Sequence, residues 1–339
     1  MLQNRKGFLN IEGTLANPFR TIYIHLSPYF FMRQPVHILD RTVLSSLLIL
    51  IGFVMVGMVI GNLAGSYVMI ALTDLSLSDL SDLEGALREA PNGWLALIIS
   101  QALVSLSMFT GAGLLYWFWI EKQPFSTFHT YQTPSPSLFL LVYIIQIVSM
   151  PISSWVQSAN AAMKLPASLQ HIENYMRAME DKLGEMTTFM TTYDSFGQFI
   201  LTFLVIGCVA GFGEELIFRG LLQRKLMQAW QNHHLAIWVS AFVFSAIHFQ
   251  FYGFFPRLFL GALFGYFYYW SGNLWIPIAA HVFNNGTAVL IMYLIHLKKI
   301  SPELEKMDSI PVIGVIVSAL LTGLGLWYFR HFVKQERKS

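Results

Sequence analysis

The apolar stretch FILTFLVIGCVAGFGEELIFRGLL (199–222) carries two adjacent glutamates and an arginine: Glu214, Glu215 and Arg219. About 20 consecutive apolar residues predict a helix that spans a membrane. Ionisable residues at membrane depth are rare, usually face the interior of a helical bundle, and indicate a functional site. This stretch therefore predicts a membrane fold and also where its chemistry lies.

The composition of the whole chain favours the same class of protein. The chain has 339 residues, of which 55% are apolar and 12% are charged, whereas soluble domains carry about 25% charged residues. The net charge of +2 does not favour a nucleic-acid partner. The single cysteine, Cys208, excludes an intramolecular disulfide and a multi-cysteine metal site. We therefore expect a protein whose surroundings are membrane lipid.

The apolar segments predict an all-α fold, a polytopic membrane helical bundle of about eight transmembrane helices with a buried polar active site. An even number of spans puts both termini on one side, and the basic residues that flank the first and last spans assign that side to the cytoplasm. With no signal peptide apparent, we expect a multi-pass protein of a prokaryotic inner (plasma) membrane. The predicted spans lie near 42–66, 94–120, 137–157, 197–228, 235–251, 256–271, 275–296 and 311–330.

We divide the chain into four parts. Residues 1–41 form a cytoplasmic N-terminal segment, and 42–196 hold the first spans and two extracytoplasmic loops. Residues 197–296 form the catalytic core, and 297–339 hold the last span and a basic cytoplasmic tail. In the long loop 158–196, apolar residues at near-helical spacing predict an amphipathic helix on the membrane surface, although a packed loop helix explains the same pattern.

The two glutamates cannot do the same work, because consecutive helical residues point about 100° apart. Glu215 and Arg219 are four residues apart in the order that favours an ion pair. Glu214 has no such partner and suits a general base that takes a proton from water. The alternative is a purely structural ion pair, with Glu214 reaching toward the cytoplasmic surface.

Two later spans carry histidines. Phe244, four residues before His248, is expected to pack against its ring and orient it. His281 and Asn285 are also four apart, so both project from one helical face and could hold an oxyanion. Taken singly, His248 is more often a packed core residue, and the His281–Asn285 pair more often an interhelical hydrogen bond.

The ordered set EExxxR, FxxxH and HxxxN, within residues 197–296, resembles the CPBP family of intramembrane endopeptidases, which includes type II CAAX prenyl proteases and bacteriocin-immunity relatives. The resemblance implies that Glu214 and His248 activate water and that His281 and Asn285 stabilise the oxyanion. It also implies that Glu215 and Arg219 support them. The expected substrate is a membrane-associated peptide or protein, with CAAX-type C-termini as one class.

The depth of each site residue along its predicted helix gives one check on whether these residues can meet. At 1.5 Å per residue, Glu214 and His248 each lie about 20 Å from the cytoplasmic ends of their predicted spans. His281 lies only about 9 Å from the start of its span by the same rise. Either the turn at 271–277 dips into the membrane, or that helix begins earlier than its apolar residues indicate.

Other functions remain open at this point. Glu214, His248 and His281 could ligate zinc, but the chain has no HExxH helix, so a mechanism without a cofactor is favoured and zinc is the alternative. A non-catalytic relative, with an immunity or scaffold role, would use the buried cluster only for packing. A transporter would use it to relay protons, but the two related halves typical of transporters are not found.

Overall fold

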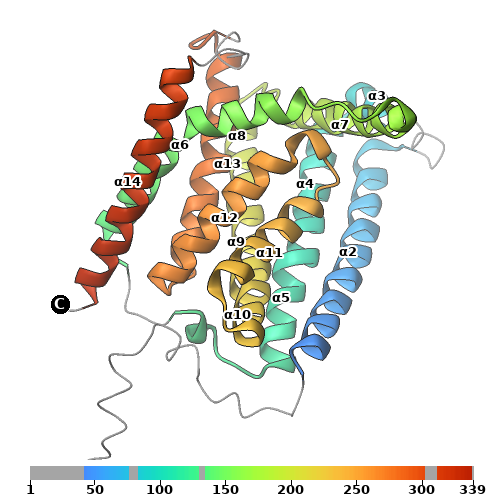
Figure 1. Cartoon of the computed structure of the whole chain (residues 1–339). Helices are drawn as coiled ribbons and strands as arrows, with labels where there is room; N and C mark the ends of the chain where they lie inside the picture. Colours follow the sequence, from blue (N-terminus) through green and yellow to red (C-terminus); the bar gives the residue numbers. More distant parts are fainter. Residues whose placement is uncertain (1–41, 76–82, 130–133, 302–310, 338–339) are drawn as a thin grey trace, which may run out of the picture. The chain divides into compact units, whose positions relative to one another are not determined.

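The computed structural model describes residues 42–75, 83–129, 134–301 and 311–337, and in these ranges the chain is helical with short connections (Figure 1). The segment 1–41 lies outside the described residues. The first described helix, α2, begins at the same end of the bundle at which the last, α14, finishes (Figure 1), as an even number of crossings requires.

Six helical spans in the described part are long and apolar enough to cross a membrane. The second and fourth spans each consist of several consecutive helical segments. The second consists of α4 (Gly93–Ser105), η3 (Leu106–Gly111), α5 (Ala112–Leu115) and η4 (Tyr116–Ile120). The fourth consists of α8 (Phe196–Thr202), η7 (Phe203–Val209), α9 (Ala210–Glu215), η8 (Leu216–Gln223) and α10 (Arg224–Trp230). The other four are α2 (Val43–Thr73), α6 (Pro136–Ala161), α13 (Trp275–His296) and α14 (Val312–Glu336).

The two remaining predicted spans are shorter helices. They are α11 (His233–Ala246), with 14 residues, and α12 (Phe254–Ser271), with 18. At 1.5 Å per residue they measure about 21 and 27 Å, less than the roughly 30 Å hydrocarbon core of a bilayer. A polytopic helical bundle is therefore confirmed, whereas the number of eight spans is not.

Local sequence signals explain where the helices begin and end. Ser195 caps the fourth span: its hydroxyl accepts from the backbone N–H of Gln198, and the Gln198 side chain accepts from the N–H of Ser195. This capping box satisfies two otherwise unpaired N–H groups. Asn232 caps α11 with its side-chain oxygen, which accepts from the N–H of Leu235. Gly272 ends α12 with a φ of 62°, a conformation that glycine adopts without a steric cost.

The fourth span contacts neighbours on several sides. It packs against α13, against the second span, and against the hairpin formed by α11 and α12. Its η7 and η8 segments are π-helical, and they flank the short α9 segment that ends at Glu215. Single π-turns inside α-helices often occur at functional sites. The apolar pattern predicts a helical span near 197–228 and does not reveal these π-helical segments.

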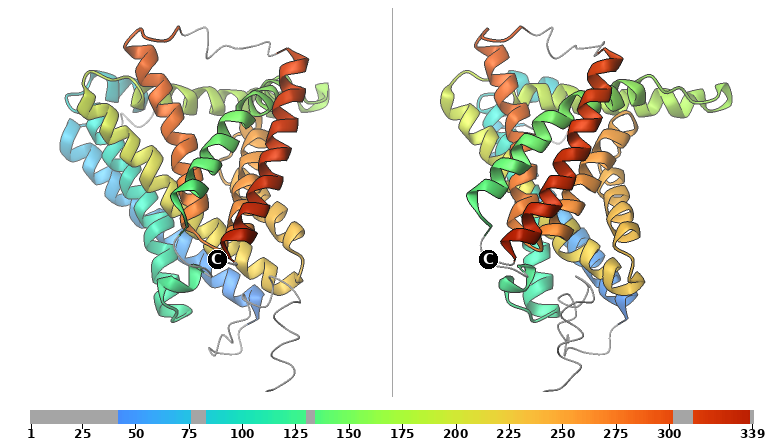
Figure 2. Two further views of the ribbon diagram at one scale, coloured as in Figure 1. Left: turned by 90° about the vertical axis from the view of Figure 1, so that its left-hand side faces the viewer. Right: turned by 60° about the vertical axis from the view of Figure 1, so that its left-hand side comes forward.

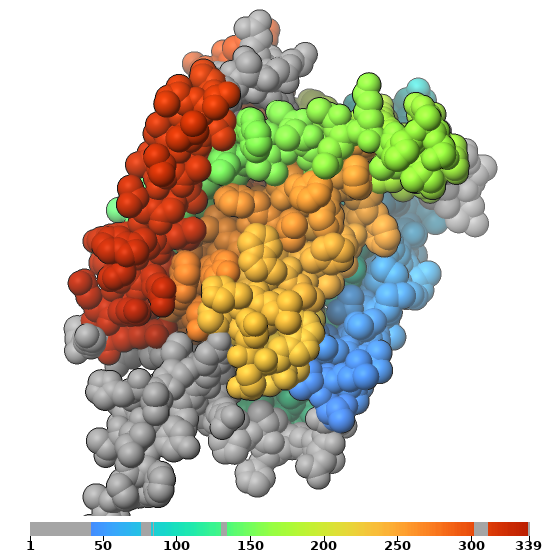
Figure 3. Space-filling view, in the orientation of Figure 1, coloured from blue at the N-terminus to red at the C-terminus, as the bar shows by residue number. Residues whose placement is uncertain are grey.

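Helix α7 (Gln170–Met190) runs across one end of the bundle, roughly perpendicular to the spans (Figures 1 and 3). The helix predicted in the 158–196 loop is thus present, preceded by η6 (Ala167–Leu169). Its apolar side chains at Ile172, Met179 and Leu183 are 38–40% exposed. That pattern fits the predicted surface helix better than a fully packed loop helix.

Polar contacts hold the connection between α11 and α12, which includes η9 (Phe251–Gly253), against α6 and α7. Asn160 at the end of α6 donates to the carbonyl of Phe251 and accepts from the N–H of Phe255. Glu180 on α7 accepts from the N–H of Tyr252, and the Arg177 guanidinium lies 3.9 Å from the centre of the Tyr252 ring. The turn that follows His248 is therefore fixed from two sides.

The turn between α12 and α13 is buried inside the protein. Asn273 and Leu274 are 3% and 0% exposed, and Asn273 pairs with His129, which follows η5 (Phe125–Phe128). Helix α13 begins at Trp275, where the apolar pattern placed it. An earlier start of this helix, one of the two explanations for the shallow position of His281, is therefore wrong, and a turn at 271–277 that dips into the membrane stays a prediction.

Candidate active site

A buried network of charged groups joins the fourth span to α13. Oε1 of Glu215 accepts a hydrogen bond from Nη1 of Arg219 at 2.6 Å and lies 2.8 Å from Nδ1 of His281. Glu215 and Arg219 are 0% and 1% exposed. The ion pair predicted from the four-residue spacing is confirmed. The contact of Glu215 with His281 was not predicted from the sequence.

Backbone and aromatic groups complete the surroundings of Arg219. Its Nη2 donates to the carbonyl oxygen of Gly261 at 2.9 Å. Its guanidinium carbon lies 4.8 Å from the ring centre of Phe244 and 5.5 Å from that of Phe264. A buried charge is tolerated only where a counter-charge and hydrogen bonds replace its water, and aromatic faces add a cation–π contribution. Arg219 is thus fixed on three sides and holds Glu215 in place.

His281 lies between the two glutamates. Because the Glu215 carboxylate is paired with Arg219 and only accepts hydrogen bonds, Nδ1 of His281 is the donor in the 2.8 Å contact. The other ring nitrogen, Nε2, lies 3.8 Å from Oε2 of Glu214. That separation is too long for a direct hydrogen bond, and a water molecule commonly bridges two polar groups at such a distance.

Glu214 differs from its neighbour in both partner and exposure. Its side chain is 12% exposed, against 0% for Glu215. The two carboxylates thus approach His281 at different ring nitrogens, as their 100° separation on the helix requires. The two glutamates therefore have different surroundings, and the prediction that they do different work stays a prediction.

His248 lies beyond the end of α11, which corrects the predicted span of 235–251. The helix ends at Ala246, and the left-handed φ of 53° at Phe249 prevents its continuation. Nδ1 of His248 nevertheless donates to the carbonyl of Phe244 at 2.8 Å, which leaves Nε2 as an acceptor. The expected packing of Phe244 against His248 is present, with ring centroids 5.3 Å apart.

Phe244 also connects the two histidines. Its ring centroid lies 5.9 Å from that of His281, so the same aromatic ring adjoins both imidazoles. The structure therefore brings His248, His281 and Glu214 to one region, with Glu214 nearest to His281. Among the described residues, no ion pair joins Glu214 directly to His248.

Asn285 is anchored on the fourth span. Its Nδ2 donates to the carbonyl of Ile206 at 2.9 Å, and its Oδ1 accepts from Nδ2 of Asn284 at 3.2 Å. A primary amide carries two N–H groups, so one of them is engaged in this interhelical bond. The oxyanion role of His281 and Asn285 stays a prediction.

The proposed zinc ligands do not converge on one point. Nδ1 of His281 is occupied by Glu215, and within the described ranges no three His, Cys, Asp or Glu side chains cluster in an arrangement suited to a metal ion. The set Glu214, His248 and His281 therefore does not fit zinc in this arrangement, and no step below is assigned to a metal.

Several residues of the site were not predicted from the sequence. The carbonyl of Gly261 and that of Ile206 contribute backbone atoms, which side-chain patterns do not reveal. Arg257 is a basic residue in an apolar segment, and its guanidinium donates to the side-chain oxygen and the carbonyl of Gln250, two residues after His248. The same reasoning that selected Glu214 could have selected Arg257, because a charged residue in an apolar segment is itself a signal.

Comparison with known proteins supports the resemblance noted from the motifs. Residues 196–287 match the family described as "Type II CAAX prenyl endopeptidase Rce1-like". The uncharacterized protein YpbD of Bacillus subtilis (strain 168) is 34% identical over 74 residues, which is 21% of this chain and 34% of that protein. The chain thus matches only about a third of the length of this relative. No solved structure matches.

The family match covers every residue of the candidate site. It begins at the start of α8 and ends within α13, close to the core of 197–296 expected from the motifs. Residues 196–287 therefore form a domain of the Rce1-like family of type II CAAX prenyl endopeptidases.

Proposed function

We propose that this protein is an intramembrane endopeptidase of the glutamic type, which hydrolyses peptide bonds in membrane-associated peptides or proteins. The observation that carries the proposal is the position of His281 between Glu214 and Glu215, inside an Rce1-like domain. One glutamate is locked in an ion pair and the other is left beside an imidazole nitrogen. Hydrolysis needs a base of this kind near water.

In the proposed mechanism Glu214 takes a proton from a water molecule, and the resulting hydroxide attacks the scissile carbonyl carbon. His248 assists through Nε2, since its Nδ1 is held by the Phe244 carbonyl. The proton on Glu214 then passes to the leaving nitrogen as the C–N bond breaks, either directly or by way of Nε2 of His281, which lies 3.8 Å away. Burial excludes bulk water and strengthens each of these interactions.

The developing oxyanion is assigned to His281 and Asn285. A protonated Nε2 of His281 and the second N–H of Asn285 are the donors available for it. Glu215 and Arg219 do not touch the substrate in this scheme. They fix the imidazole of His281 and therefore act as positioning residues, while Phe244 orients both histidine rings.

The mechanism requires no cofactor, and a chelator tests this. We expect cleavage to persist in 1,10-phenanthroline. Loss of cleavage that zinc restores would instead favour the zinc-dependent version of the protease. We also propose that the protein lies in a prokaryotic plasma membrane with both termini in the cytoplasm, and that CAAX-type C-termini are one class of client.

The test compares new peptide termini in membranes from cells that express the wild type with those from cells that express Glu214→Gln. The amide retains the shape of the side chain but cannot act as a base, so we expect a loss of cleavage of roughly 10²-fold or more, as for removal of a general base. The sequences at the wild-type termini show directly whether the clients are of the CAAX type.

Equal protein levels in the two membranes are the control for folding. Identical termini at equal levels would contradict the proposal and favour the non-catalytic relative, an immunity or scaffold protein of the same fold, because a scaffold tolerates an isosteric amide.

A further inference from the structure

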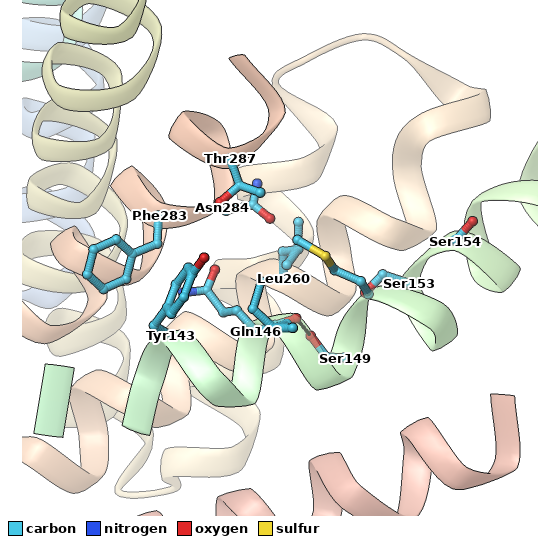
Figure 4. Close-up of a pocket in the computed structure, with 11 residues that line it drawn as sticks. Tyr143, Gln146, Ser149, Ser153, Ser154, Leu260, Phe283, Asn284 and Thr287 are labelled. Atoms are coloured by element: carbon cyan, nitrogen blue, oxygen red, sulfur yellow. Dashed lines mark hydrogen bonds between the residues drawn. The ribbon is translucent and has the colours of Figure 1, made fainter. Parts of the chain in front are cut away.

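A cavity of about 250 Å³ lies between α6, α12 and α13 (Figure 4). Its wall on α6 includes Tyr143, Gln146 and Ser153, and its wall on α13 includes Asn284 and Thr287. In Figure 4 the side chains of Gln146 and Asn284 extend from their two helices toward the same space. None of these residues has a role in the mechanism above.

Gln146 is the unusual residue of this cavity. Its side chain is 5% exposed, and neither Oε1 nor Nε2 has a hydrogen-bond partner among the described residues. It stands ten residues into α6, about 15 Å along that helix, near the middle of the span. A buried amide without partners is costly, most of all at membrane depth, so the cavity requires a polar occupant.

The lining selects for a neutral occupant. The described residues around the cavity supply hydroxyl and amide groups, with apolar side chains between them, and include no charged side chain. Ser153 Oγ is also buried without a partner in the described part of the chain. A primary amide presents a donor and an acceptor side by side, which is the complement of the C=O and N–H groups of a peptide backbone.

The cavity adjoins the candidate active site through α13. Asn284 lines the cavity, and its Nδ2 donates to Oδ1 of Asn285, an assigned site residue, at 3.2 Å. At 100° per residue, Asn284 lies about 60° around the helix from His281. An occupant of the cavity would therefore lie beside the helix that carries half of the site.

We propose that this cavity binds the backbone of a substrate peptide next to the scissile bond, with Gln146 pairing with one of its peptide groups. The substrate assignment rests on the proposed function, whereas the binding of a peptide backbone can be measured without any cleavage. Water is the competing occupant, since the volume has room for about eight molecules at roughly 30 Å³ each.

The test measures protection of a cysteine placed in the cavity. The protein carries Cys208→Ser and Ser153→Cys, and a small methanethiosulfonate reagent modifies the new thiol in detergent. The probes are acetyl-tetraleucine methylamide and an analogue in which ester oxygens replace the backbone N–H groups. We expect the peptide to slow modification and the ester analogue to do so weakly. Gln146→Leu should raise the peptide concentration needed by about tenfold, the effect of losing one or two hydrogen bonds.

Gln101→Leu is the matched control, because Gln101 is exposed on α4, and it should leave protection unchanged. Modification that the peptide does not slow would overturn the inference and assign the cavity to water. Equal protection by both probes in the protein that retains Gln146, or peptide protection that is unchanged in Gln146→Leu, would overturn it too, since either result indicates apolar partition only. Cleavage without protection contradicts this inference alone, whereas protection without Glu214-dependent cleavage contradicts the proposed function.

Discussion

Glu215 uses a single oxygen atom for two partners, Arg219 and His281. Its other oxygen, Oε2, has no hydrogen-bond partner among the described residues. An arrangement selected only for stability would pair both oxygens, because a buried unpaired acceptor costs free energy. The network is better explained as a device that sets the orientation of the imidazole at the expense of some stability.

Removal of the Arg219 guanidinium should destabilise the protein. We expect Arg219→Met to lower the free energy of unfolding by about 3–5 kcal/mol, because it leaves the Glu215 carboxylate buried without its counter-charge. The measurement is unfolding of the purified protein in mixed detergent and SDS, followed by tryptophan fluorescence.

The double variant Glu215→Gln/Arg219→Met serves as the control for lost packing. With no unpaired charge left, it should be more stable than Arg219→Met alone. If the double variant is less stable than the wild type by the sum of the two single-variant losses, the two residues act independently and the ion pair is not the cause.

At the scale of single residues, the sequence predicted pairings within one helix better than those between helices. The Glu215–Arg219 pair follows from a four-residue spacing, and so does the contact of Phe244 with His248. The Glu215–His281 bond joins residues 66 positions apart, and it depends on how the fourth span packs against α13. No local pattern contains that information.

At the scale of elements, glycines set how closely the first two spans approach. A Cβ added at Gly57 on α2 would lie 2.3 Å from the carbonyl oxygen of Ser107 in η3, and one at Gly61 would lie 2.7 Å from Cα of Val104. These contacts are with backbone atoms, which cannot move aside as a flexible side chain can. Small residues of this kind let transmembrane helices pack closely.

Gly57→Ala should therefore separate α2 from the second span and destabilise the protein by about 1–3 kcal/mol, the usual cost of overpacking. Gly52→Ala on the same helix is the matched control, because a Cβ there meets no described atom within 4 Å. Alanine has the higher helix propensity, so the control should be neutral or slightly stabilising. Equal destabilisation of both variants in SDS unfolding would show that the α2 contact is not tight.

The docking of α7 should depend on pH through Glu173. The backbone N–H of Leu165 and the Arg177 guanidinium both bond to the Glu173 carboxylate, and they lower the pKa of this group below its ordinary value. A lowered pKa contributes stability at pH values above about 4.3, the unfolded value for Glu. That contribution is lost as the pH falls through the folded pKa.

The thermal unfolding midpoints of the wild type and Glu173→Gln, measured from pH 7 down to pH 3, test this dependence. The wild type should be the more stable protein at pH 7, and the difference should shrink below about pH 4.3. A difference that stays constant over the whole range would mean that the carboxylate charge has no part in holding α7.

The element boundaries show what hydropathy can and cannot predict. The spans near 94–120 and 275–296 agree with the structure within one residue, because the apolar residues end where the helices end. The first span runs to Thr73 rather than residue 66, because the apolar run continues through residues 68–72, beyond Gly65 and Ser66. The π-helical segments of the fourth span lie within a continuous apolar run, so hydropathy alone does not mark them.

At the scale of the whole molecule, α7 and the C-terminal end of α14 lie at opposite ends of the helical bundle (Figures 1 and 2). If the basic flanks set orientation as proposed, α7 faces the exterior and the end of α14 faces the cytoplasm. Single cysteines introduced at Lys182 and Gln335, both exposed, report on the two ends when Cys208 is replaced by serine.

A membrane-impermeant maleimide added to intact cells should label Lys182→Cys and should leave Gln335→Cys unlabelled until the cells are permeabilised. The reverse pattern would invert the proposed orientation while leaving the fold unchanged. Labelling of both positions in intact cells would contradict the crossing pattern itself. Both positions would then lie on the same side of the membrane, whereas an odd number of crossings between α7 and the end of α14 puts them on opposite sides. The experiment thus separates the direction of insertion, which positive charge determines, from whether the number of crossings between α7 and the end of α14 is odd or even.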